Sequence, residues 1–169
     1  VHERVYAAMS RPIIGHLDPV FLDLMDRLQG NLRRTFGTEN AMTLPVSGTG
    51  SAGMQACFAN LLEVGDEVVV GVNGVFGTRM ADVAERLGAR VRRVEAEWGE
   101  VIPAEALAEA LAACDSPRLL AVVHAETSTG AWQPVQGLAQ LAHDSGALLM
   151  VDAVTSLAGC PLEVDAWDI

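Results

Sequence analysis

Short apolar runs that alternate with segments of helical spacing constrain the fold of this chain most strongly. The clearest runs are Val68-Val69-Val70, Leu119–Val123 and Ala147–Val151. They lack the polar–apolar alternation of a half-exposed strand, and such continuous runs are typical of strands covered on both faces. We therefore expect an α/β domain with a mostly parallel sheet and helices on both faces.

The expected elements follow one another in a regular order. Strands are predicted at 42–46, 67–72, 89–94, 119–123 and 147–151, and helices at 19–36, 52–62, 76–87, 104–113 and 135–143. The first helix begins behind Asp18 and Pro19, a capping residue followed by one suited to the first helical position. Residues 1–16 are expected to form an arm. The chain thus divides into an N-terminal arm and helix, residues 1–40, and an α/β domain, residues 41–169.

Composition excludes several classes of protein. The chain has 11 basic and 22 acidic residues, and its net charge of −11 disfavours a general binder of nucleic-acid backbones. All 11 basic residues are arginines, so the chain contains no lysine. No apolar run approaches the ~20 residues of a membrane-spanning helix. The three cysteines have neither disulfide-framework nor CxxC spacing, so we expect a cytoplasmic location and no metal site.

Four loops rich in polar residues follow the expected strands. They are Ser47–Ser51, Asn73–Phe76, His124–Gly130 and Asp152–Ser156. In parallel sheets, ligands bind beyond the carboxyl ends of the strands, where such loops meet. We therefore expect these loops to form one binding site.

The first loop, Ser47-Gly48-Thr49-Gly50-Ser51-Ala52-Gly53, is expected to follow a strand and to open a helix. Free N–H groups, hydroxyls and closely approaching glycines favour a phosphate site there. The glycines also spell GxGxxG, the dinucleotide fingerprint. That fingerprint requires an acidic residue at the end of the next strand. Here the next strand ends at Gly71-Val72-Asn73, which contains no acidic residue. A Rossmann-like nucleotide-binding module is therefore disfavoured but stays open.

The other three loops also carry candidate side chains. Phe76 could stack on a planar cofactor, although a lone phenylalanine is more often part of the core. His124, Glu126 and the hydroxyl groups of their loop could bind a ligand, perform acid–base chemistry or form a capped turn. Asp152 directly follows a buried strand and needs a partner there, such as a cationic ligand atom.

Together these motifs resemble the class V, fold-type I pyridoxal-phosphate aminotransferases, with closest similarity to the alanine–glyoxylate and serine–glyoxylate (serine–pyruvate) branch. The resemblance extends over nearly the whole chain. It rests on the arm at 9–16, SGTGS at 47–51, NGVFG at 73–77, HAETSTG at 124–130, VDAVTSLAG at 151–159 and VDAWDI at 164–169. It implies that residues 41–169 are part of the large, cofactor-binding domain of that family.

The resemblance also implies which residues contact pyridoxal 5'-phosphate. Thr49, Gly50 and Ser51 would hold the phosphate at the start of a helix. Phe76 would stack on the pyridine ring, and Thr127 would bond its phenolic oxygen.

Two further residues of the motifs would act on the ring. Asp152 would pair with the pyridine nitrogen and keep it protonated, so that the ring can accept electrons from the substrate's α-carbon. Val154 would pack under the ring. Gly15 and His16, in the arm, would approach the substrate.

The family also needs a Schiff-base lysine, and this chain has none. We therefore expect the chain to be a fragment that has no catalytic residue of its own and lacks the C-terminal domain. For the intact protein, the resemblance implies transfer of an amino group from alanine or serine to glyoxylate or pyruvate. It also implies a homodimer.

Two alternatives stay open. One is another class V enzyme: a ureidoglycine–glyoxylate, phosphoserine or aminoethylphosphonate aminotransferase, or a cysteine desulfurase. His16 disfavours the ureidoglycine branch, which typically has an amide side chain there, and Phe76 stands where desulfurases carry a histidine. The other is the non-catalytic Rossmann-like module.

Overall fold

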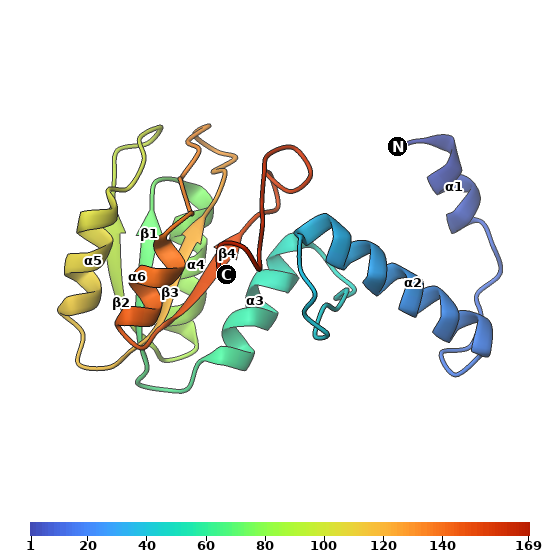
Figure 1. The fold of residues 1–169 in the computed structure, drawn as a ribbon, viewed down its shortest axis with the longest axis horizontal. Helices are drawn as coiled ribbons and strands as arrows, with labels where there is room; N and C mark the ends of the chain where they lie inside the picture. Colours follow the sequence, from blue (N-terminus) through green and yellow to red (C-terminus); the bar gives the residue numbers. More distant parts are fainter.

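The computed structural model describes residues 1–169 and is built around one four-stranded sheet (Figure 1). The strands are β1 (Glu67–Val72), β2 (Arg90–Glu95), β3 (Pro117–Val123) and β4 (Leu148–Asp152), in the spatial order β2-β1-β3-β4. Every neighbouring pair is parallel, as predicted. The carboxyl ends of all four strands therefore lie at the same edge of the sheet.

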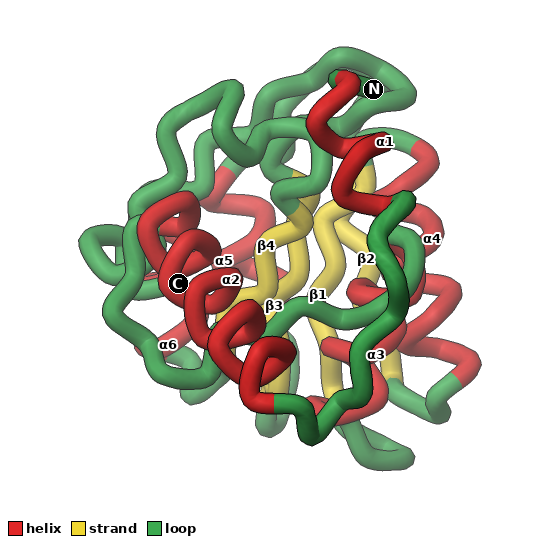
Figure 2. The backbone as a smooth tube through the Cα atoms, turned by 90° about the vertical axis from the view of Figure 1, so that its right-hand side faces the viewer, coloured by secondary structure: helices red, strands yellow, loops and turns green.

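Helices cover both faces of the sheet, which Figure 2 shows between two helical layers. These helices are α3 (Gly50–Leu61) and α4 (Val75–Arg86) on one face, and α5 (Ala104–Ala112) and α6 (Leu138–Asp144) on the other. Successive strand residues point to opposite faces, so Val69 and Leu120 pack in the α5–α6 core, whereas Val70 and Ala121 pack in the α3–α4 core. This double coverage explains the continuous apolar runs.

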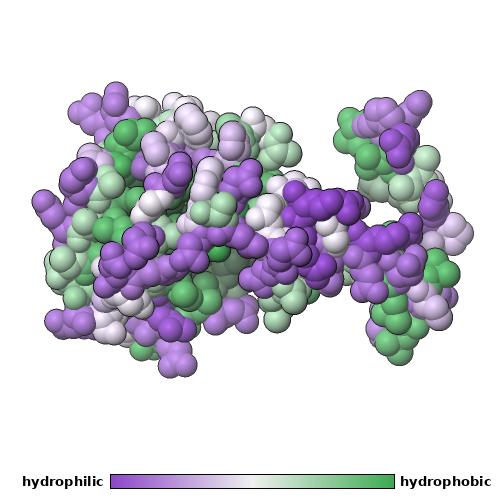
Figure 3. Space-filling view, viewed as in Figure 1, coloured by the Kyte–Doolittle hydropathy of each residue, from purple (hydrophilic) through white to green (hydrophobic).

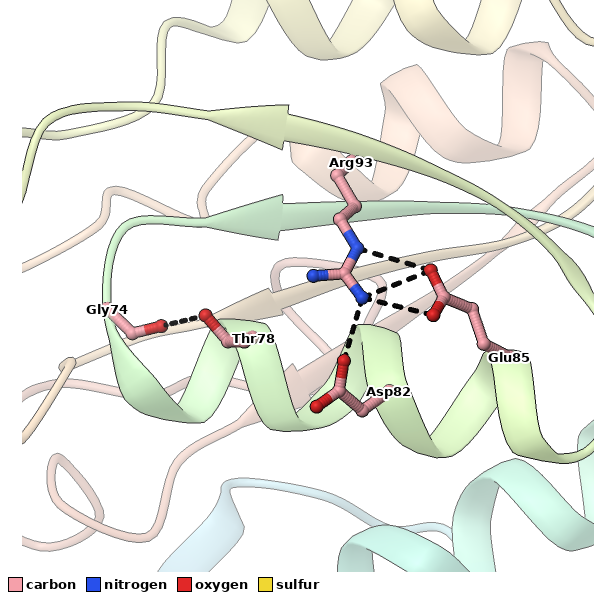
Figure 4. Close-up of polar contacts among 5 residues, drawn as sticks. All are labelled: Gly74, Thr78, Asp82, Glu85 and Arg93. Carbon is pink, nitrogen blue, oxygen red and sulfur yellow. Dashed lines mark hydrogen bonds and ion pairs between the residues drawn. The ribbon is translucent and has the colours of Figure 1, made fainter.

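Salt bridges fix α4 to the edge strand β2 (Figure 4). The guanidinium of Arg93 in β2 lies 2.7 Å from Asp82 Oδ1 and 3.1 Å from Glu85 Oε1, both on α4. At the other end of the helix, the Thr78 hydroxyl donates a 2.9 Å hydrogen bond to the carbonyl of Gly74. The ion pairs thus tie the later turns of α4 to β2, and the Thr78 bond closes the first turn of the helix.

Two N-terminal helices project from the sheet domain: α1 (Glu3–Met9) and α2 (Pro19–Phe36). Helix α2 has the predicted bounds; Asp18 caps its first turn, and Gly37 ends it in the left-handed conformation. Apolar side chains on both helices are exposed, among them Tyr6, Val20 and Leu22 (Figure 3). None of the helices combines the length and the apolarity needed to cross a lipid bilayer.

Two local predictions are wrong. Residues 1–16 are not an arm throughout, because Glu3–Met9 is helical. The strand predicted at 42–46 does not form. There, Asn40 accepts hydrogen bonds from Met42 N–H and the Thr43 hydroxyl, and Pro45 has no N–H for a ladder. The glycine-rich loop therefore follows an irregular segment, although it opens helix α3 as predicted.

Candidate functional site

A cavity of about 160 Å³ lies at the carboxyl ends of β3 and β4, against the first turns of α3 and α4. All seven predicted cofactor-binding residues line it: Thr49, Gly50, Ser51, Phe76, Thr127, Asp152 and Val154. The remaining wall consists of Met54, Val123, Ala125 and Thr155, none of which is a predicted site residue. Residues more than 100 positions apart in the sequence therefore surround one cavity. Their roles toward a cofactor stay predictions.

The N-terminus of α3 forms one wall. Thr49 is its N-cap residue and makes no side-chain capping bond. The N–H of Ala52 donates to the Thr49 carbonyl, whereas the N–H groups of Gly50 and Ser51 have no acceptor in the chain and are open to an external one. A Cβ at Gly50 would lie 3.1 Å from Val154 Cγ2, and a Cβ at Gly48 would lie 2.8 Å from Ala52 Cβ. The glycines thus permit close packing around a helix end whose positive dipole favours an anion.

Phe76 lies opposite, in the first turn of α4, and is half-buried. The Arg79 guanidinium carbon is 5.1 Å from the centroid of its ring. Arg79 also donates a 2.9 Å hydrogen bond to the hydroxyl of Ser51. Arg79 is not among the predicted site residues, yet it brings a positive charge next to both the predicted phosphate site and the predicted stacking ring. The spacing of three residues from Phe76, which puts both on one helix face, was the available signal.

Asp152 and Thr127 supply polar groups to the cavity from β4 and from the loop after β3. Asp152 Oδ1 accepts a 3.0 Å hydrogen bond from the N–H of Val154, while Oδ2 accepts none from the chain. The hydroxyls of Thr127 and Thr155 are hydrogen-bonded to each other. One carboxylate oxygen thus remains free for a cationic or N–H group of a ligand.

The two ionisable residues of the HAETSTG motif do not line the cavity. His124 and Glu126 are each only 1% exposed. Nε2 of His124 accepts a 3.0 Å hydrogen bond from the indole of Trp132, and burial lowers the pKa of this histidine. Glu126 accepts hydrogen bonds from the α4 turn and from Ser128. The ligand or acid–base role considered for Glu126 is therefore replaced by an internal one.

The predicted substrate residues lie elsewhere. Gly15 and His16 are exposed, in the connection between α1 and α2, and neither lines the cavity. Their proposed approach to a substrate stays a prediction. The chain has no lysine, so none of its side chains can form the Schiff base that the family uses.

The donor set of the cavity fits pyridoxal phosphate. Helix N–H groups, the Ser51 hydroxyl and the nearby Arg79 suit the phosphate, and Phe76 offers an aromatic face. The free oxygen of Asp152 suits a protonated ring nitrogen, which a neutral acceptor would hold less strongly. The cavity therefore has an anion-binding side and a cation-binding side, as this cofactor requires.

Comparison with known proteins gives the same family. The family model described as aminotransferase class-V matches residues 2–169. A rat alanine–glyoxylate aminotransferase is 42% identical over 166 residues, which are 98% of this chain and 40% of the rat protein. The (S)-ureidoglycine–glyoxylate transaminase of Bacillus subtilis is 37% identical over 169 residues, 100% of this chain and 40% of that protein.

Solved structures agree. The crystal structure of an alanine–glyoxylate aminotransferase from Nostoc sp. superimposes with a TM-score of 0.95 at 51% identity, covering 99% of this chain and 44% of that one. The chain spans about 40% of the length of these curated relatives. The family model covers nearly all of it, and pyridoxal phosphate is the cofactor that this membership implies. The chain belongs to the class V aminotransferase family.

Proposed function

We propose that the protein containing this chain transfers an amino group from a small amino acid, alanine or serine, to glyoxylate or pyruvate. In this proposal residues 41–169 form most of the pyridoxal-phosphate site. The observation that carries it is the convergence of Thr49, Phe76, Thr127 and Asp152 on one cavity. The names of the rat and Nostoc relatives support the glyoxylate branch.

Each wall of the cavity has a task in this proposal. The N–H groups at the start of α3 and the Ser51 hydroxyl bind the phosphate, and Phe76 orients the ring plane. Asp152 Oδ2 holds a proton on the ring nitrogen, because an adjacent carboxylate favours the cationic form. When bound, pyridoxal phosphate supplies an electron sink for the charge that develops at the substrate's α-carbon. Thr127 donates its hydroxyl to the ring oxygen.

A donor–acceptor matrix tests this proposal. The purified full-length gene product is incubated with glyoxylate or pyruvate and one donor: alanine, serine or (S)-ureidoglycine. Glycine is measured where glyoxylate is the acceptor, and alanine where pyruvate is the acceptor and the donor is serine or (S)-ureidoglycine. Glyoxylate-dependent turnover of alanine or serine is the expected result. A protein that binds the cofactor yet uses neither alanine nor serine contradicts the proposed substrates. A protein that binds no pyridoxal phosphate contradicts the proposed cofactor site.

A second candidate is ureidoglycine–glyoxylate transamination. The observation in its favour is the Bacillus subtilis relative, which matches the whole chain at 37% identity. His16 is the residue against it, since that branch typically has an amide side chain at this place. Preference for (S)-ureidoglycine over alanine in the same matrix would favour this candidate.

The homodimer predicted from the resemblance also remains a proposal. The exposed apolar residues of α2 support it: Val20, Leu24 and Leu28 recur every four residues on one face of the helix, and contiguous exposed apolar surface favours association. Light scattering on the eluting full-length protein measures its mass directly. A monomer at micromolar concentration would contradict this part of the proposal.

A further inference from the structure

A buried carboxylate joins two loops of the candidate cofactor site. Glu126 follows β3, and only 1% of its surface is exposed. Its Oε2 accepts hydrogen bonds from the backbone N–H groups of Phe76 and Gly77, at 3.0 and 3.1 Å. Its Oε1 accepts from the backbone N–H and the hydroxyl of Ser128, at 3.1 and 2.6 Å. Glu126 therefore ties the first turn of α4 to its own loop.

No arginine pairs with the Glu126 carboxylate. Burying such a charge is costly unless donors surround it. Here four hydrogen bonds satisfy both oxygens, and the positive end of the α4 dipole faces the carboxylate. The ionised form is the one that accepts all four bonds, because an amide or a protonated acid would turn a donor toward these donors. The environment is thus built for a carboxylate.

Ser128 extends this connection. Its hydroxyl donates to Glu126 and accepts a 2.9 Å hydrogen bond from the N–H of Val75. The three N–H groups of Val75, Phe76 and Gly77 therefore all end on two side chains of one distant loop. We call Glu126 and Ser128 the loop latch.

The glycines that flank Phe76 make room for the loop latch. A Cβ at Gly74 would lie 2.4 Å from Glu126 Cγ and 2.6 Å from Ser128 Oγ. A Cβ at Gly77 would lie 2.7 Å from the carbonyl oxygen of Gly71 in β1. The NGVFG motif thus allows the carboxylate to reach the helix and allows the helix to lie against β1.

The loop latch lies directly beside two walls of the cavity. Thr127, between its two members in sequence, lines the cavity, and so does Phe76, whose N–H the latch binds. We propose that Glu126 is a positioning residue for the cofactor, which fixes the Phe76 ring and the Thr127 hydroxyl at one separation across the cavity. This inference rests on the proposed cofactor site. A loosened latch would let the two walls move relative to each other.

Glu67 provides a matched control. It is also a buried carboxylate, 8% exposed, and it accepts a 2.9 Å hydrogen bond from the N–H of Ser116. Unlike Glu126, it also has a cation nearby, since its Oε1 lies 3.9 Å from the exposed guanidinium of Arg90. It lies at the start of β1, at the opposite edge of the sheet from the cavity. A purely structural role of a buried carboxylate should therefore show the same effects in Glu67→Gln as in Glu126→Gln.

The experiment compares these two variants with wild type in the full-length protein. Three quantities are measured: Tm, the Kd of pyridoxal phosphate for the apoprotein, and the circular dichroism of the bound cofactor. We expect Glu126→Gln to raise that Kd about tenfold, the effect on an equilibrium of losing about one hydrogen bond to a charged group. We also expect a changed cofactor dichroism. Glu67→Gln should lower Tm while leaving Kd and dichroism as in wild type.

Other outcomes separate the two proposals. Wild-type Kd and dichroism in Glu126→Gln overturn the positioning role. Failure of the wild-type protein to bind pyridoxal phosphate overturns the proposed function itself. If Glu126→Gln does not fold, Ser128→Ala removes the Val75 acceptor and one Glu126 donor with little change in volume. A weaker cofactor affinity in that variant supports the latch, and unchanged affinity overturns it.

Discussion

Trp132 donates a 3.0 Å hydrogen bond from its indole N–H to Nε2 of the buried His124. The neutral ring must therefore carry its proton on Nδ1, and that atom is buried with no partner in the chain. Burial lowers the pKa of His124, because a charged ring would lose its hydration without gaining an acceptor. The histidine is thus held neutral.

A pH dependence of stability follows from this pair. The unfolded chain binds a proton at His124 with a pKa of about 6.5, and the folded chain binds it only at lower pH. The contribution of neutral His124 to the free energy of unfolding is therefore fully present above pH ~6.5, and it decreases as the pH falls below that value. We expect His124→Phe to flatten this fall. Urea unfolding at several pH values between 5 and 8 measures it, with His16→Gln, at an exposed histidine, as control. Parallel curves for wild type and His124→Phe would contradict the prediction.

The second prediction concerns charge at the ring nitrogen. Asp152→Asn keeps the Val154 hydrogen bond but removes the negative charge at Oδ2. We expect turnover of the full-length protein to drop about 10²–10³-fold, the range found when one electrostatic stabiliser is removed. Tm should change little, because Asp152 is partly exposed. Asp144→Asn, on the exposed side of α6, is the control, and turnover near wild type in Asp152→Asn would reject the assignment.

The third prediction concerns Arg79 and the phosphate. Its guanidinium binds Ser51 and lies over Phe76, so it adds positive charge beside the α3 N-terminus. We expect Arg79→Met to weaken binding of pyridoxal phosphate about threefold to tenfold, as the loss of an exposed charge and a cation–π contact would. Binding of pyridoxal, which lacks the phosphate, should change less.

Arg86→Met is the matched control for Arg79, since it removes the same charge from the same helix. Both arginines line a larger open hollow next to the cavity, but only Arg79 contacts Ser51. Equal effects of the two variants would show that the overall positive electrostatic potential of α4, rather than the contact with Ser51, governs the affinity for pyridoxal phosphate. Equal weakening for pyridoxal and its phosphate would contradict the phosphate assignment.

Four of the five predicted strands form, because their sequence signal is local. The β1 bounds agree residue for residue, since its apolar run is bounded by turn residues at Gly65-Asp66 and Asn73-Gly74. The 42–46 segment failed for a local reason too: side chains of Asn40 and Thr43 compete for its backbone. Such hydrogen bonds between side chains and backbone leave no periodic pattern in the sequence from which they could be predicted.

The site was predictable only in part. The motif residues lie close together because each motif follows a strand of the parallel sheet, and the carboxyl ends of parallel strands meet at one edge. The role of Glu126 could not be predicted from its loop, because the N–H groups that it binds lie 49 and 50 positions away on another element. Only the pairing of β1 with β3 brings them within reach.

The last prediction concerns how the N-terminal helices join the sheet domain. Asp165, near the end of the chain, accepts hydrogen bonds from the Thr38 hydroxyl and from the N–H of Glu39, just beyond α2. These bonds, the Thr38 bond first, hold the pKa of Asp165 below its usual value. The stabilisation of the folded state by ionised Asp165 is therefore fully present above the pKa of this residue in the unfolded chain. It is lost as the pH falls through the lower pKa of the folded chain.

Asp165→Asn should loosen the junction between α2 and the sheet domain without unfolding the sheet. An amide can keep both contacts only if its N–H₂ faces the Thr38 hydroxyl, which then accepts instead of donating, and neither bond is any longer strengthened by a charge. Hydrogen exchange at residues 38–41 should become faster, while exchange within β1 and β3 stays slow because those strands are buried. Asp168→Asn, whose partner is His143 on α6, serves as the control near the same end of the chain. Faster exchange throughout the sheet would mean that Asp165 stabilises the whole domain rather than this junction.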